Sequence, residues 1–227
     1  MGTPVDALAE AAVGAIRDRM VVGLGTGRAA ARAIEALARR ARDEKLALTC
    51  VATSRASDEQ ARSLGLQTVP MNGVERLDYL FDGADEVDEQ LRMIKGRGGA
   101  MTREKIVARA ASRRVYLVQS EKLVSRLGAS APLPVEVLAF GLASARAALN
   151  RLGLKGEVRT KDDGSTYLTD NGNPVIDAHL ARTHDVEMLA AMLDGVPGVV
   201  GHGLFLHEAD VVLIEDASGA ITSRERS

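Results

Sequence analysis

Acidic, basic and glycine residues gather in one segment of the chain, between Asp82 and Lys105. Asp82 and Asp85 lie three positions apart in a turn that follows an apolar run, and Lys95 opens a glycine-rich stretch. Glu104 lies near the start of an expected helix. Two carboxylates at this spacing can converge on the hydroxyl groups of a sugar. A base, a cation and a flexible backbone beside them favour proton transfer on a small polar anion.

Two residues of this segment have the types that proton transfer needs. A helix N-terminus favours the ionised form of Glu104, which is the form of a general base. Lys95 can reach a ligand oxygen on which negative charge develops. The ordinary alternatives are a first-turn glutamate favoured by the helix dipole and a solvated lysine. We expect Glu86, Asp88 and Glu89 in the same acidic turn to be solvated.

A glycine-rich loop lies earlier in the chain, in the segment Gly23-Leu24-Gly25-Thr26-Gly27. It follows an expected strand and opens an expected helix, where backbone N–H groups and the helix dipole attract phosphate. The dinucleotide fingerprint requires glycine where Arg28 stands, so no nicotinamide cofactor is expected, and no Walker A motif follows. By itself the loop fits an anion site or a tight structural turn. Arg28 favours the anion site, because a guanidinium binds phosphate bidentately.

Other kinds of site are not expected. The acidic turn lacks calcium-loop spacing, and the four histidines, at positions 179, 184, 202 and 207, lack metal-binding spacing, so we expect no metal and structural or surface histidines. A net charge of -2 gives no basic field for nucleic acid. No apolar stretch approaches the ~20 residues of a membrane helix, so we expect a soluble cytoplasmic protein. The single cysteine, Cys50, is expected to be buried.

Apolar periodicity and turn residues predict the elements that position these side chains. Helices are expected at 7–20, 28–42, 55–64 (capped by Thr53-Ser54), 105–112, 140–152 and 186–193. Strands are expected at 20–24, 46–52, 67–69, 77–81, 115–118, 157–160, 167–169, 175–177, 199–205 and 209–214.

The alternation of strands and helices predicts an α/β protein. We expect an open, mostly parallel sheet with helices on both faces, of Rossmann-like type, and a smaller inserted α+β domain. The α/β catalytic domain is predicted to comprise 1–130 and 204–227, and the small domain 131–203. The strand at 209–214 is expected to return to the main sheet.

In its motifs the chain resembles ribose-5-phosphate isomerase of the A type. The resemblance covers nearly the whole chain, and its motifs occur in order. They are Val22-Gly23-Leu24-Gly25-Thr26-Gly27, Asp82-Gly83-Ala84-Asp85-Glu86, Ile94-Lys95-Gly96, Thr102-Arg103-Glu104-Lys105-Ile106-Val107, Pro132-Leu133-Pro134-Val135-Glu136-Val137, Thr169-Asp170-Asn171-Gly172-Asn173 and Pro197-Gly198-Val199-Val200.

The resemblance implies an aldose–ketose isomerase that interconverts D-ribose 5-phosphate and D-ribulose 5-phosphate in the pentose phosphate pathway. It implies a metal-free enediolate route without a cofactor, and a homodimer or homotetramer. By position, Glu104 corresponds to the general base that moves a proton between C2 and C1. Asp82 and Asp85 correspond to residues that hold sugar oxygens and assist ring opening. Lys95 corresponds to the cation that stabilises the enediolate.

The resemblance also implies a set of substrate-binding residues in four loops. The first loop and a later lysine bind the phosphate, and the glycine-rich loop supports the enediolate charge. These residues are Thr26, Gly27, Arg28, Ala29, Gly83, Ala84, Gly96, Arg97, Gly98 and Lys122.

The chain departs from the family pattern at several of these positions. The phosphate loop usually reads Gly-Ser-Thr where this chain has Gly27-Arg28-Ala29, so a guanidinium replaces two hydroxyl donors. Arg97 interrupts a run of three glycines, Glu121 replaces the serine before Lys122, and the first lysine is Lys45. Two alternatives stay open, a non-catalytic sugar-phosphate sensor and an isomerase of another sugar phosphate. The acid and base residues argue against the sensor, as does the lack of a DNA-binding module.

Overall fold

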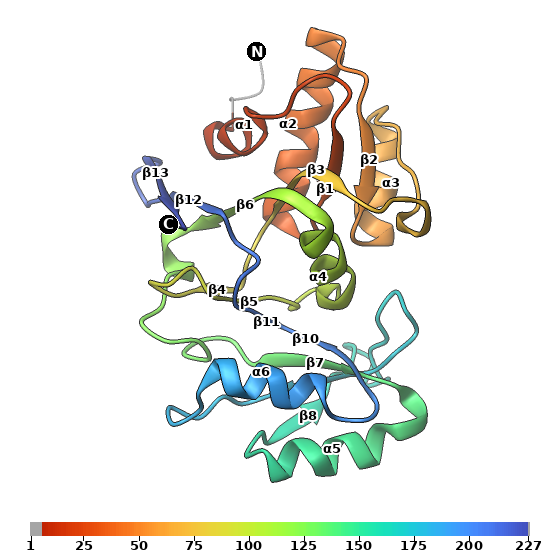
Figure 1. The fold of residues 1–227 in the computed structure, drawn as a ribbon, viewed down its shortest axis with the longest axis vertical. Coiled ribbons are helices and arrows are strands. Elements are labelled where there is room, and N and C mark those ends of the chain that lie inside the picture. The colour runs from red at the N-terminus through yellow and green to blue at the C-terminus, as the bar shows by residue number, and fades with distance from the viewer. Residues whose placement is uncertain (1–5, 227) are drawn as a thin grey trace. The chain divides into compact units, whose positions relative to one another are not determined.

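The computed structural model describes residues 6–226, which form two compact units (Figure 1). The first unit comprises the residues up to Ala84, then Arg103–Lys122, then the residues from Glu208 onwards. The second unit comprises Asp85–Thr102 and Leu123–His207. The domain bounds expected from the sequence, 1–130 with 204–227 and 131–203, stay a prediction.

The first unit contains a six-stranded sheet with the strand order β13-β12-β6-β3-β1-β2. Its strands are β1 (Val21–Leu24), β2 (Thr49–Ala52), β3 (Leu77–Asp82), β6 (Ala111–Gln119), β12 (Val211–Glu215) and β13 (Ile221–Glu225). All neighbours are parallel except β12 and β13, which form an antiparallel pair. The mostly parallel sheet is therefore confirmed, and β12 returns to it beside β6 as expected.

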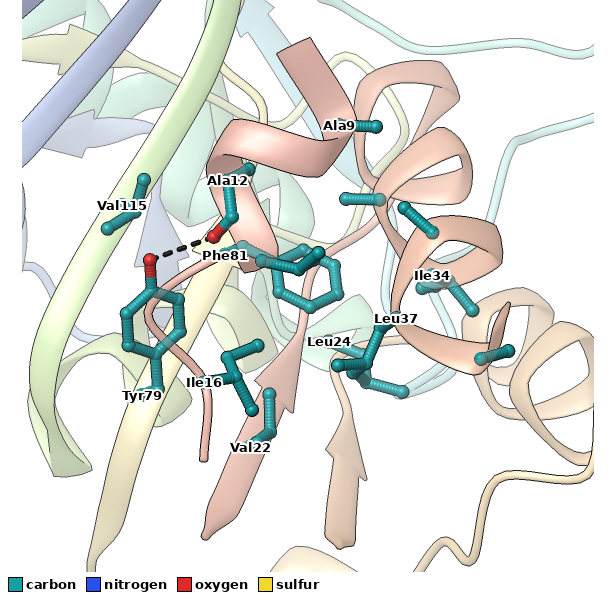
Figure 2. Close-up of a cluster of buried hydrophobic side chains, with 14 of the residues drawn as sticks. Ala9, Ala12, Ile16, Val22, Leu24, Ile34, Leu37, Tyr79, Phe81 and Val115 are labelled. Carbon is teal, nitrogen blue, oxygen red and sulfur yellow. Dashed lines mark hydrogen bonds between the residues drawn. The ribbon is translucent and has the colours of Figure 1, made fainter. Parts of the chain in front are cut away.

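Helices cover both faces of this sheet, as the sequence predicts. They are α1 (Ala7–Val13), α2 (Arg28–Glu44), α3 (Arg55–Ser63) and α4 (Met101–Ala110), with short 3₁₀ turns at Met71–Gly73 and Ser120–Lys122. On one face, Tyr79 and Phe81 pack with α1 and α2, and the Tyr79 hydroxyl donates to the carbonyl of Ala12 at 2.8 Å (Figure 2). Alternate side chains of a strand face opposite sides. Leu80 accordingly lies on the other face, where a Cβ at Gly23 would lie 2.9 Å from Leu80 and 2.8 Å from Val107 of α4.

Several expected elements of the first unit have other bounds. The helix expected at 7–20 ends at Val13, whose carbonyl accepts a hydrogen bond from the guanidinium of Arg40 in α2. The helix expected at 105–112 is α4, which begins at 101 and ends at 110. Ala111 instead pairs with Leu77 and starts β6.

The expected strand at 67–69 is only an isolated bridge between Thr68 and Cys50. Ser54 caps α3 as predicted and accepts a hydrogen bond from the backbone N–H of Ser57. Cys50 is buried as predicted, and burial raises the pKa of its thiol to about 12. Among residues 6–226, no helix combines the length and apolarity that a membrane span requires.

The second unit is an α+β structure with two antiparallel sheets, ordered β10-β7-β9-β8 and β11-β5-β4. The strands are β4 (Glu86–Val87), β5 (Met93–Ile94), β7 (Leu133–Val137), β8 (Gly156–Val158), β9 (Val175–Ala178), β10 (Val199–His202) and β11 (Leu204–Phe205). The helices are α5 (Leu142–Arg151), preceded by a 3₁₀ turn at Ala139–Gly141, and α6 (Val186–Asp194).

Two strand predictions in the second unit are wrong. The segment 199–205 breaks at Gly203 into β10 and β11, which belong to different sheets. Gly203 is needed there, because a Cβ would lie 2.2 Å from the carbonyl oxygen of Lys95. The segment 167–169 is not a strand and has only an isolated bridge between Leu168 and Pro174. The central strand β7 was not predicted, because Pro134 within it argues against a strand by local rules.

Candidate active site

The loop after β1 contacts the end of β3 within the first unit. Asp82, the last residue of β3, is fully buried, and its Oδ1 accepts hydrogen bonds from the backbone N–H groups of Thr26 at 3.1 Å and Gly83 at 2.7 Å. A Cβ at Gly25 would lie 2.2 Å from this oxygen, so only glycine allows the approach. The structure thus brings two motifs together that are far apart in the sequence.

The side chain of Thr26 belongs to a small network of hydroxyl groups. Its Oγ1 lies 2.7 Å from Oγ1 of Thr53, which also donates to the carbonyl of Leu24 at 3.0 Å. Ser57 donates to the carbonyl of Gly25 at 2.6 Å and ties the start of α3 to the same loop. From the sequence, Thr53 was expected only as part of a helix cap, and Ser57 carried no signal for this loop. The Thr26 hydroxyl therefore helps to hold the loop.

The N-terminus of α2 lies next to the Asp82 turn. Gly27 precedes the helix with φ 97° and offers no side-chain cap, so the dipole of a 17-residue helix begins at backbone N–H groups. Arg28 is exposed in the first turn, and Ala29 is half-buried. A Cβ at Gly83 would lie 3.3 Å from the Cβ of Ala29, which places the acidic turn against this helix start.

Glu104 is buried in the first turn of α4, with 4% of its surface exposed. Tyr116 of β6 is fully buried and pairs in register with Asp82 of β3. Burial raises the pKa of the Tyr116 hydroxyl well above its usual value, and the nearby carboxylates of Asp82, Glu104 and Glu208 raise it further. The two candidate catalytic carboxylates therefore act on the same buried phenol, which stays neutral. Sequence reasoning missed Tyr116, because its strand reads as ordinary core.

Lys122 lies in the 3₁₀ turn that follows β6 and is half-buried. The strands β1, β3 and β6 are parallel, so their carboxyl ends lie at one edge of the sheet. Asp82 ends β3, and the loop before α2 and Lys122 follow the ends of β1 and β6. Ligands bind at this edge in open α/β sheets.

In the second unit, Asp85 and Lys95 are held by backbone hydrogen bonds. Oδ2 of Asp85 accepts from the N–H of Arg97 at 2.9 Å. Lys95 is 3% exposed, its N–H donates to the carbonyl of Gly203 at 2.9 Å, and its Nζ lies 5.6 Å from the ring centroid of Phe205. The alternative of a solvated lysine is therefore wrong. The ammonium group of Lys95 is largely shielded from water and makes a cation–π contact with Phe205.

Two carboxylates expected to be solvated are buried instead. Glu86 is fully buried, and its carboxylate accepts hydrogen bonds from the backbone of Gly128 at 2.6 Å and Ala131 at 2.7 Å. Asp88 is 3% exposed and accepts from the N–H and Nε of Arg92 at 2.9 and 2.7 Å. Buried carboxylates persist when such donors surround them. Only Glu89 of this group is exposed, as predicted.

A cavity of about 310 Å³ lies within the second unit. Charged side chains of both signs line it, from two predicted site residues and from two that sequence reasoning missed: Asp85, Arg97, Arg159 and Asp177. The rest of the wall is formed by Ser130, Ala131, Pro132 and Pro134. Arg159 and Asp177 carried no motif signal because they are distant in sequence from the acidic turn.

His202 is structural, as predicted for the histidines. It is 2% exposed and accepts a hydrogen bond from the N–H of Leu204 at 3.2 Å, and its Nε2 lies 3.2 Å from Asp194. Within residues 6–226, no group of three or more His, Cys, Asp or Glu side chains is arranged to hold a metal ion.

An open parallel sheet with an uncapped helix N-terminus and buried carboxylates at its carboxyl edge defines an α/β enzyme that acts on a small anionic substrate. The model of the family described as ribose 5-phosphate isomerase A (phosphoriboisomerase A) matches residues 49–219. The chain belongs to this family.

Individual relatives agree with this assignment. Ribose-5-phosphate isomerase A of Roseiflexus sp. is 43% identical over 94% of this chain and 92% of its own length. The protein of the same name from Dinoroseobacter shibae is 41% identical over 96% of this chain and 85% of its own length. A solved D-ribose-5-phosphate isomerase in complex with phospho-erythronic acid superposes with a TM-score of 0.91 at 34% identity, over 96% of each chain. The chain is accordingly an aldose–ketose isomerase that interconverts ribose 5-phosphate and ribulose 5-phosphate.

Proposed function

We propose that Glu104 is the general base of this isomerisation. Its carboxylate removes the proton from C2 of the open-chain aldose, and the electron pair moves through the C1–C2 bond onto the carbonyl oxygen to form an enediolate. A proton then passes from the C2 hydroxyl to the C1 oxygen, the C2 oxygen becomes the ketose carbonyl, and Glu104 delivers the proton that it holds to C1. The observation that carries the proposal is the burial of Glu104 in the first turn of α4, where its carboxylate, like that of Asp82, acts on the buried Tyr116 phenol. A carboxylate shielded from water and fixed on a helix is positioned for such a transfer.

The phosphate of the substrate is proposed to bind at the loop before α2. Four residues supply this site: the backbone and side chains of Thr26, Gly27, Arg28 and Ala29. The uncapped N–H groups of α2 and the guanidinium of Arg28 provide donors and positive charge. Gly83 and Ala84 continue the same site from the end of β3, and Lys122 adds a cation. The solved relative in complex with phospho-erythronic acid supports a phosphorylated ligand for this chain.

We propose that two carboxylates, a lysine and a loop backbone bind the sugar oxygens and stabilise the developing charge. Asp82 and Asp85 bind hydroxyl groups and assist ring opening. Lys95, with the backbone N–H groups of the loop Gly96-Arg97-Gly98, stabilises the enediolate oxygen. The side chain of Lys95 lies almost fully shielded from water, where a positive charge interacts strongly with a developing negative one.

Isomerisation in D₂O tests the proton-transfer route. We expect solvent deuterium at C1 of the ketose, because a carboxylic acid formed on Glu104 exchanges with solvent in a fraction of turnovers. Glu104→Gln should lose both isomerisation and exchange. Complete retention of substrate hydrogen at C1, together with dependence on a divalent ion, would instead indicate a hydride shift and contradict the proposal.

A cytoplasmic homodimer or homotetramer is part of the same proposal and rests on the family assignment. Light scattering on the eluting peak of a size-exclusion column measures the mass of the particle directly. A mass of 24.0 kDa, that of one chain, would contradict it.

A further inference from the structure

The loop from Gly96 to Gly99 has the composition of a flexible segment. Its glycines gain much conformational entropy on unfolding, so a single loop conformation requires contacts that offset this entropy. One internal hydrogen bond closes the turn, from the N–H of Gly99 to the carbonyl of Gly96 at 2.9 Å. The N–H of Arg97 donates to Asp85. Among the described residues, the N–H of Gly98 has no hydrogen-bond partner, which leaves it as the loop's available donor.

Two side chains of the second unit, more than 60 positions later in the sequence, bind the carbonyl groups of this loop. Nη1 of Arg159 donates to the carbonyls of Gly96 and Arg97, both at 3.0 Å. The hydroxyl of Tyr167 donates to the carbonyl of Gly98 at 2.9 Å. The packing is close, because a Cβ at Gly99 would lie 2.3 Å from the Tyr167 oxygen. Three successive carbonyls are thus bound by two side chains.

Arg159 is itself fixed in place. Its Nε and Nη2 donate to the two carboxylate oxygens of Asp177 at 2.8 and 2.6 Å, and its side chain is 14% exposed. The guanidinium lies 5.5 Å from the ring centroid of Tyr167. The backbones are paired as well, since the N–H of Tyr167 donates to the carbonyl of Arg159 at 2.9 Å. The planar guanidinium of Arg159 therefore binds the Asp177 carboxylate on one side and two loop carbonyls on the other. A lysine ammonium group cannot make this set of hydrogen bonds.

In a planar trans peptide the C=O and the following N–H point in opposite directions. Holding the carbonyl of Arg97 therefore sets the direction of the N–H of Gly98. We propose that Arg159 and Tyr167 are positioning residues of the isomerisation, which act through the loop backbone by aiming the Gly98 N–H at the enediolate charge. This inference rests on the proposed role of the loop. A donor already aimed at developing charge needs no reorganisation during the reaction.

Three variants test the proposal: Arg159→Ala, Arg159→Lys and Tyr167→Phe. The Gly98 N–H is proposed to interact with charge that develops in the transition state. Displacing this donor should therefore lower kcat, while KM stays within about twofold of the wild-type value. We expect kcat to fall about 10²-fold for both Arg159 variants and about 5-fold for Tyr167→Phe, which keeps the ring beside Arg159. The loss should be equal across the pH profile, because the base is untouched. Arg146→Ala is the matched control, since Arg146 forms an exposed ion pair with Glu157 in the same unit.

Hydrogen exchange of the peptide spanning 96–99, in the full-length unliganded protein, gives a readout independent of activity. The exchange rate should rise in the Arg159 variants and stay unchanged in Arg146→Ala. Unchanged exchange overturns the proposal, and so does faster exchange with kcat within twofold of the wild type. Should an Arg159 variant fail to fold, Tyr167→Phe decides the outcome by the same criteria. Full turnover in Glu104→Gln would remove the proposed base but leave the Arg159 result standing, so the two failures are distinguishable.

Discussion

Replacing Glu104 with glutamine removes the proposed base while it keeps the shape of the side chain. The amide cannot accept the C2 proton. A positioned base contributes ~10²–10⁴-fold in rate, which corresponds to about 3–5 kcal/mol of activation free energy. Glu104 is 4% exposed, so water cannot readily take its place, and we expect a loss in kcat near the upper end, about 10⁴-fold. Glu104→Asp withdraws the carboxylate by about one bond length and should lose about 10²-fold.

The assay follows ketose formation from ribose 5-phosphate through a coupled enzyme. Each variant is also checked by circular dichroism and thermal unfolding. An amide of equal size should change the unfolding free energy by about 1 kcal/mol or less, so that Tm stays within about 4 °C. Glu89→Gln is the matched control, because Glu89 is an exposed glutamate of the acidic turn. A folded Glu104→Gln protein whose kcat stays within tenfold of the wild type would refute the reasoning.

Three further predictions concern the phosphate, the pH and metal ions. Arg28→Ala should raise KM about tenfold with kcat little changed, because a lost charged contact to phosphate weakens ground state and transition state alike. Arg42→Ala, in the last turn of the same helix, should leave KM unchanged, and equal KM values for both variants would remove Arg28 from the site. Burial raises the pKa of the Cys50 thiol from 9.0 to about 12, so its contribution to stability is complete below pH 9 and is lost as pH rises toward 12. The loss between pH 9 and pH 10 should be about 1 kcal/mol in urea unfolding, and an equal pH dependence in Cys50→Ala would contradict this. Treatment with EDTA should leave turnover unchanged, and a loss reversed by a divalent ion would overturn the metal-free route.

Much of the first unit could be predicted because its signals are local. The strand–glycine–helix pattern at 21–44 and the cap at Ser54 follow from side-chain periodicity and hydrogen-bonding capacity within a few residues. Where local rules failed, a distant contact decided. The helix at 101–110 gives way to β6 because Ala111 pairs with Leu77, and the carbonyl of Val13 at the end of α1 accepts a hydrogen bond from Arg40 of α2.

The acidic turn shows the same division. Its residue types and its position after a strand indicate chemistry from the sequence alone. The sequence of the turn does not show which of its carboxylates are buried and structural, because the donors to Glu86 come from residues 128–131. Local sequence does not encode the register that brings these backbone N–H groups to the carboxylate.

By itself the sequence determined the class of the sheet, the family and the chemically active residue types, because each rests on short patterns and ordered motifs. Tertiary structure alone decided the surroundings of those residues. It placed Tyr116 beside the carboxylates of Asp82 and Glu104, and it brought Arg159 and Tyr167 onto the glycine loop. The physical reason is that burial, electrostatic coupling and carbonyl orientation depend on pairs of residues far apart in the chain, whose meeting only the packed fold specifies.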